Sequence, residues 1–132
     1  MEKLRAELEQ VRTASEALLR QTIDKPSGQP DLVHIVWFKL KDDIQQNGVE
    51  ELIKKIDKLK EIPEVHALEV GRFHDLEDPR AMSEFGLVMS MRFETDQDYR
   101  AYQAHPIHVE LKTLVKDYLS GPPVTYDYLA TH

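Results

Sequence analysis

The chain has 132 residues, of which 41% are apolar and none is cysteine, so it can bury one core but cannot use disulfides, thiolate metal ligands or a cysteine nucleophile. A formal net charge of -7 argues against nucleic acid and anionic membranes as partners, because both select clustered lysine and arginine. No apolar run approaches the roughly 20 residues of a membrane span, and the charged N-terminus does not resemble a secretory signal. We therefore expect a cytoplasmic protein.

Residues 1–22 are predicted to form an amphipathic helix, because one stripe of side chains repeats in steps of four and three residues. The stripe comprises Leu4, Leu8, Val11, Ser15 and Leu18. A helix this short is marginal alone, so it should dock on the domain or on the same helix of another subunit. Residues 23–31 contain two prolines and a glycine and are predicted to be a linker, which leaves residues 32–132 as the domain.

The first predicted strand covers residues 32–40 and is rich in Val, Ile, Trp and Phe. Both of its faces are largely apolar, so we expect both to be buried. Residues 48–62 then carry apolar side chains at helical spacing. Asn47 is the expected N-cap of this helix, two glutamates follow in the first turn, and Pro63 ends it.

Two further strands should follow. Residues 65–73 are predicted to form a strand in which His66, Leu68, Val70 and Arg72 share one face. After a polar loop, residues 85–93 should form a third strand with large apolar side chains on one face. That face comprises Phe85, Leu87, Met89, Met91 and Phe93.

A proline interrupts the helical region after the third strand. Thr95 should cap a helix that ends near Ala104, and Pro106 should begin a second helix, because proline lacks an N–H donor and suits the first helical turn. The buried stripe of the second helix is expected to comprise Ile107, Leu111, Leu114, Val115 and Tyr118. Residues 124–129 are the last predicted strand, and one of its faces comprises Val124, Tyr126 and Tyr128.

The domain therefore has the element order β-α-β-β-α-β, which predicts an α+β, ferredoxin-like fold with a four-stranded antiparallel sheet and both core helices on one face. The other face would leave Val88 and half of the first strand in water, at a cost on the order of 1.5–3 kcal/mol per large side chain. Such a face is an interaction surface, and its simplest cover is a second copy related by a twofold axis. We therefore predict a homodimer formed through sheet-to-sheet packing.

The most distinctive motif of the chain is Tyr-Gln-Ala-His-Pro-Ile-His, from Tyr102 to His108. Together with the opening strand at 33–40, the segments 62–65 and 69–71 and the run 93–95, it resembles the stress-responsive dimeric α/β-barrel (Dabb) family. The resemblance spans about residues 32–129. It implies a stress-response A/B barrel protein, built from two ferredoxin-like subunits whose sheets join into a barrel and binding a small apolar ligand.

Some members of this family, the olivetolic acid cyclase-like proteins, close a polyketide ring with a histidine and a tyrosine. Matching the motif places these roles on His108 and Tyr102, and a further pocket histidine on His34. The resemblance thus implies a cofactor-independent cyclase, isomerase or monooxygenase-like enzyme acting on an apolar carbonyl compound. Histidine titrates near neutral pH and a buried phenol can donate to an enolate oxygen, which suits proton abstraction beside a carbonyl. Candidate substrate contacts are His105, Trp37 and Phe38.

The same residues also have a purely structural interpretation, in which His105 caps the helix junction, His108 bonds a backbone carbonyl and Tyr102 is core. The protein would then be a non-catalytic ligand-binding or stress-associated dimer. An enzyme would need a closed apolar cavity of roughly 300 Å³ or more, faced by His108 and Tyr102. No metal or cofactor is expected: Pro106 distorts the spacing of the two histidines, and HExxH patterns, carboxylate clusters and glycine-rich phosphate loops are missing from the sequence.

Overall fold

Four strands form one antiparallel sheet in the order β2-β3-β1-β4 in the computed structural model, which describes residues 30–131. The strands are β1 (Leu32–Phe38), β2 (His66–Arg72), β3 (Leu87–Phe93) and β4 (Val124–Leu129). The helices are α1 (Gln46–Asp57), α2 (Asp96–Ala104) and α3 (Pro106–Leu114), and 3-10 turns η1 (Lys58–Glu61) and η2 (Val115–Asp117) extend α1 and α3. This confirms the ferredoxin-like plan, whereas the predicted N-terminal helix lies outside the described residues.

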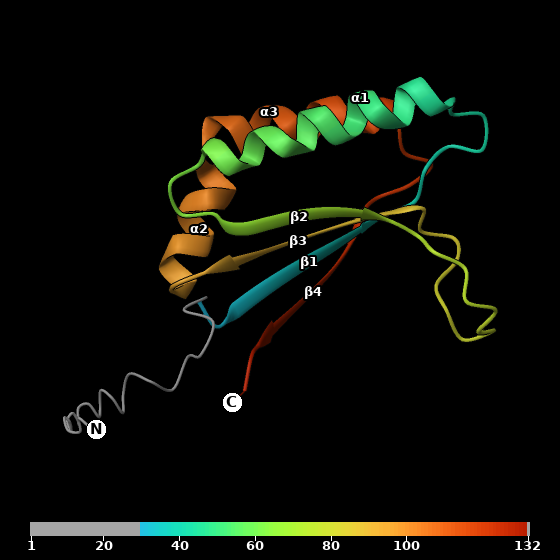
Figure 1. Cartoon of the computed structure of the whole chain (residues 1–132). Helices are drawn as coiled ribbons and strands as arrows, with labels where there is room; N and C mark the ends of the chain where they lie inside the picture. The colour runs from blue at the N-terminus through green and yellow to red at the C-terminus, as the bar shows by residue number, and fades with distance from the viewer. Residues whose placement is uncertain (1–29, 132) are drawn as a thin grey trace, which may run out of the picture. The chain divides into compact units, whose positions relative to one another are not determined.

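The helices α1 and α3 cover one face of the sheet, and α2 lies near the end at which β3 finishes (Figure 1). We call the covered face the inner face. It carries the core because β1 and β3 pair in register and alternate apolar side chains toward the helices. Fully buried members of this core include Leu52, Ile56, Leu59, Ile62, Leu87, Met91 and Phe93. The apolar face predicted for the third strand is confirmed over residues 87–93.

The helix α1 begins earlier than its sequence pattern indicates. It starts at Gln46, so the predicted cap Asn47 lies inside the helix and Glu50 lies beyond its first turn. Side-chain contacts of Gln46 stabilise the added residues: its amide donates to Glu50 at 3.2 Å and accepts from Arg72 of β2 at 3.1 Å. The helix also ends earlier, at Asp57, and continues as a 3-10 turn.

A β-bulge changes the face alternation predicted for β2. The register of β2 against β3 shifts between His66 and Glu69, and Ala67 within this interval has a φ of 53°, a left-handed conformation that costs a non-glycine residue on the order of 1 kcal/mol. Val70 pairs with Met89 on the inner face, but His66 pairs with Arg92 on the other face. The prediction that His66 and Val70 share one face was therefore wrong.

The proline break lies where the sequence predicts it. The Thr95 hydroxyl accepts the Asp98 N–H at 3.0 Å to cap α2, which ends at Ala104, and Pro106 begins α3. Leu111 and Val115 are buried against the sheet, as expected for positions four residues apart. Leu114 was predicted to join them but is 36% exposed, because it faces the groove that α3 forms with Lys55 and Lys58.

The outer face of the sheet is only partly covered in the single chain. Residues Val33, Ile35 and Trp37 of β1 pair with Tyr128, Tyr126 and Val124 of β4 on this face. Val33 is buried, Ile35 and Trp37 are half-buried, and the three β4 residues are 40–60% exposed. The expectation that both faces of β1 are buried thus holds fully only for the inner face. No helix in residues 30–131 has the length and apolar character needed to cross a membrane.

Candidate functional site

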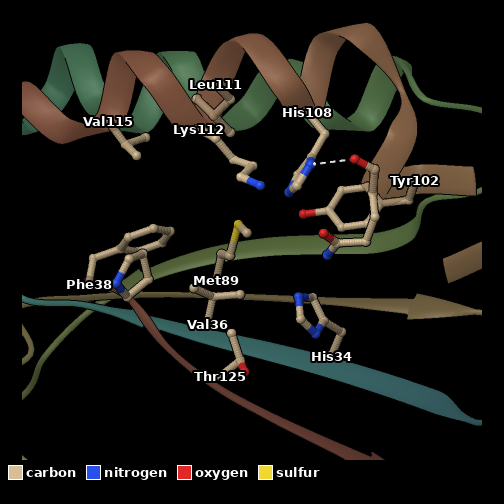
Figure 2. A pocket seen from close by; sticks show the side chains of 12 residues that line it. His34, Val36, Phe38, Met89, Tyr102, His108, Leu111, Lys112, Val115 and Thr125 are labelled. Carbon is tan, nitrogen blue, oxygen red and sulfur yellow. Dashed lines mark hydrogen bonds between the residues drawn. The ribbon is translucent and has the colours of Figure 1, made fainter. Parts of the chain in front are cut away.

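A pocket of about 220 Å³ lies between α3 and the part of the sheet formed by β1 and β4 (Figure 2). Its wall is mostly apolar and includes Val36, Phe38, Met89, Leu111 and Val115. Its polar wall residues come from four elements, β1, α2, α3 and β4, and they comprise His34, Tyr102, Gln103, His108, Lys112 and Thr125. The volume is below the 300 Å³ expected of an enzyme cavity, but a larger groove of about 740 Å³ adjoins the pocket and shares Lys112, Val115 and Pro123 with it.

Tyr102 comes from the last turn of α2 and is completely buried. Its hydroxyl has no hydrogen-bond partner among residues 30–131, although the residue lines the pocket. Burial, with a smaller contribution from Tyr99, raises the pKa of Tyr102 far above its ordinary value. The phenol therefore stays protonated at neutral pH, and its O–H is a donor without a partner among residues 30–131.

His108 is oriented by the break between α2 and α3. In an unbroken helix the Gln103 carbonyl would accept the N–H of Ile107, but that N–H donates instead to His105 Nδ1 at 3.1 Å. The carbonyl of Gln103 is thereby left for His108 Nδ1, at 3.1 Å. A carbonyl can only accept, so Nδ1 carries the proton and Nε2 of the neutral ring is an acceptor.

The environment of His108 also favours the neutral imidazole. Burial lowers the pKa of His108, and the charges of Lys112 and His34 lower it further, against the opposing effect of the Gln103 hydrogen bond. The His108 and Tyr102 rings are adjacent, with centroids 4.4 Å apart. A proton acceptor and a proton donor thus lie side by side on the helix side of the pocket.

His34 lies on the opposite, sheet side of the pocket (Figure 2). It pairs with Asp127 across β1 and β4, and its Nδ1 is hydrogen-bonded to the Asp127 carboxylate. The imidazole is buried, whereas the Asp127 side chain is about half exposed. Because Nδ1 is bound to the carboxylate, Nε2 is the ring nitrogen that remains for the pocket.

Asp127 was missed in the sequence analysis. It lies on the strand face opposite Tyr126 and Tyr128, and the alternation of side chains along β4 predicts this position. Its partner follows only from the pairing of β1 with β4, residue for residue. A ferredoxin-like plan with that register would have identified it.

The structure brings some of the predicted site residues together and separates others. His34, Phe38, Tyr102 and His108 all line the pocket. Trp37 points to the outer face, since it pairs there with Val88 and Val124. The ring nitrogen Nδ1 of His105 caps α3, His108 bonds a backbone carbonyl and Tyr102 belongs to the buried core, so all three features of the structural interpretation are confirmed.

Metal ligation has little support in the part of the chain described here. Within residues 30–131, no three His, Cys, Asp or Glu side chains gather closely enough to hold a metal ion. His105 and His108 each use Nδ1 in a hydrogen bond with the backbone at the helix junction. The arrangement instead suits proton exchange with an organic molecule: a phenol donor, an imidazole acceptor and a second, carboxylate-bound imidazole face one apolar space.

Comparison with known proteins supports the family resemblance that the Tyr102–His108 motif indicates. Residues 32–128 match the sequence model of the stress responsive A/B barrel domain, Dabb. The stress-response A/B barrel domain-containing protein DABB1 of Arabidopsis thaliana is 34% identical over 79 residues, which are 59% of this chain and 37% of that protein. A second stress-response A/B barrel domain-containing protein of the same plant is 31% identical over 78 residues, 59% of this chain and 28% of that protein. This chain thus spans only about a third of the length of these curated relatives.

Solved structures share the fold. A hydroxynitrile lyase from Passiflora edulis superposes with a TM-score of 0.68 at 19% identity, covering 78% of this chain and 96% of that one. An Arabidopsis thaliana protein gives 0.65 at 25% identity, covering 76% and 96%. A dimeric ferredoxin-like protein of unknown function from Thermobifida fusca gives 0.62 at 24% identity, covering 78% and 93%. The family match over most of the domain, carried on this fold, means that the chain belongs to the stress responsive A/B barrel domain (Dabb) family.

Proposed function

We propose that this protein binds a small carbonyl compound in the pocket and catalyses proton transfer on it without a cofactor. The observation that carries the proposal is the Tyr102 hydroxyl, which is fully buried and has no partner among the described residues. Leaving a buried hydroxyl unpaired costs on the order of 1–3 kcal/mol. A bound carbonyl oxygen would accept its hydrogen bond and remove that cost.

In this reaction His108 is the base and Tyr102 the electrophilic donor. The neutral Nε2 of His108 takes a proton from the carbon beside the carbonyl, so a C–H bond breaks and an N–H bond forms. The electron pair moves to the carbonyl oxygen, where the Tyr102 O–H stabilises the developing enolate. His34 with Asp127 is the third group of the site and faces the ligand from the sheet.

The size and scaffold of the site are compatible with this role. The pocket of about 220 Å³ suits the body of a small ligand, and the adjoining groove offers room for a longer substituent. The fold is also one that enzymes use, since a hydroxynitrile lyase shares it. That likeness supports the view that this fold can hold a catalytic site, but it does not identify a substrate for this chain.

The ring-opening elimination of 5-nitrobenzisoxazole tests the pair, because it needs one base in an apolar pocket and one donor to the phenolate that forms. We expect His108→Asn to lower the rate at least about 100-fold and Tyr102→Phe to lower it less. His74→Asn, in the exposed loop after β2, is the matched control and should keep the wild-type rate. Equal rates in all four proteins, with each variant folded, would exclude His108 and Tyr102 as the pair.

We further propose that two copies associate through their outer sheet faces into a homodimer. Exposed Val124, Tyr126 and Tyr128 adjoin the half-buried Ile35 and Trp37 on that face, which forms a continuous apolar surface. Sedimentation should give twice the mass of one chain at micromolar concentration, and Tyr126→Glu should give a folded monomer. A monomeric wild-type protein would contradict the proposed interface.

A further inference from the structure

Lys112 places a positive charge at the pocket that the proposed proton transfer does not use. It follows His108 by four residues on α3, so the two side chains lie on one side of the helix. Lys112 lines both the pocket and the adjoining groove. Figure 2 shows its side chain extending from α3 into the pocket, beside His108 and above Met89. The ammonium group therefore lies where the apolar pocket meets the groove.

This ammonium group has no ion-pair partner within residues 30–131. The described residues that line the pocket include no aspartate or glutamate, and the carboxylate behind the sheet-side wall, Asp127 of β4, is bound to His34. The surrounding wall is apolar, with Val36, Met89 and Val115 among its members. Lys112 is an exposed residue, but the apolar wall on one side of its ammonium group lowers the local dielectric, so the group interacts with an anion somewhat more strongly than it would in open water.

We propose that Lys112 recognises a carboxylate, so that the ligand of this pocket is a keto acid: its carbonyl at Tyr102, its apolar body against the sheet and its carboxylate at the groove. The inference rests on the proposed function, because it takes the Tyr102 hydroxyl as the partner of the carbonyl. One helical turn, about 6 Å, separates His108 from Lys112 along α3, and the flexible lysine stem can adjust to the chain length of the acid. The same charge helps to keep His108 neutral and ready to accept a proton.

Two probes of the same size and shape, one charged and one neutral, test the proposal: 3-benzoylpropionate, an aryl keto acid, and its primary amide. Binding is followed by NMR shifts of the pocket residues and by calorimetry, without any turnover. We expect the carboxylate to bind about three- to tenfold more tightly than the amide, and this preference to shrink as salt is added. Lys112→Met, which keeps the apolar stem, should abolish the preference by weakening the carboxylate alone.

Lys54 provides the matched control, because it is an exposed lysine of α1 that lines neither the pocket nor the groove. Lys54→Met should keep the preference for the carboxylate. Equal affinities of acid and amide, an equal loss of both in Lys112→Met, an equal effect of Lys54→Met, or no saturable binding of the acid at millimolar concentration would each overturn the proposal. Because binding is measured without chemistry, a failure of proton transfer at His108 would be seen separately, in the elimination assay.

Discussion

The space between the sheet and the helices has two halves that differ in kind. In the closed half, beneath α1, the side chains of Leu52, Ile56 and Leu87 are completely buried and wholly apolar. In the open half, beneath α3, the inner-face residues Thr125 and Asp127 of β4 remain exposed, because the helices do not extend over that strand. The buried polar residues of the described chain, His34 and His108, both lie in this open half. The closed half therefore stabilises the fold, and the open half is where we propose that a ligand binds.

The largest expected effect is in the closed half. Leu52→Ala removes a fully buried side chain from a well-packed core and should lower the free energy of unfolding by about 2–5 kcal/mol. Chemical denaturation measures this free energy of unfolding. Val109→Ala on α3, where the side chain is 52% exposed, is the control and should change stability by about 0.5 kcal/mol or less. Similar losses for both variants would remove the distinction between a packed core and a solvated surface.

Tyr102→Phe sharpens the comparison, because stability and function should change in opposite directions. The substitution removes the unpaired hydroxyl and keeps the ring, so the free energy of unfolding should rise by up to about 1–3 kcal/mol. Ligand affinity and elimination rate should fall. A loss of stability in Tyr102→Phe would mean that the hydroxyl is satisfied in the folded protein, and the proposed donor would be lost with it.

The pH dependence of stability should show a smaller effect from His108. Folding lowers the pKa of His108, chiefly through burial, so below an ordinary pKa of about 6.5 the unfolded chain binds the proton more readily than the folded one. This contribution to stability is complete above that pH and is lost as the pH falls through the folded pKa. Denaturation at about pH 7.5 and about pH 5 should therefore show a loss that is smaller in His108→Asn. An identical loss of stability in the variant would mean that folding does not change the pKa of His108.

The sequence was sufficient for the apolar face of β3 and for the helix junction. Alternation over residues 87–93, the Thr95 cap and the Pro106 break all follow from local rules on periodicity and backbone donors, and the structure confirms them. The errors fall where distant contacts override local patterns. Hydrogen bonds of the Gln46 side chain with Glu50 and Arg72 extend the start of α1, and the bulge at Ala67 moves His66 to the outer face.

The open half could be predicted only in part, since its geometry depends on the register between distant strands. The motif identified Tyr102 and His108, but the unpaired state of the Tyr102 hydroxyl depends on what surrounds it in space. Asp127 reaches His34 through the pairing of β4 with β1, and Lys112 reaches the pocket through the rotation of α3 over the sheet. Neither residue carries a local signal, because an acidic residue in an exposed strand and a lysine on an amphipathic helix are both ordinary surface features.

The most direct test of the open half is a crystal structure of the protein with 3-benzoylpropionate bound. We expect the ketone oxygen within hydrogen-bonding distance of the Tyr102 hydroxyl, and the adjacent CH₂ group facing Nε2 of His108. A probe that occupies the pocket with its ketone turned to solvent, or that leaves the pocket empty and binds elsewhere, would contradict the account.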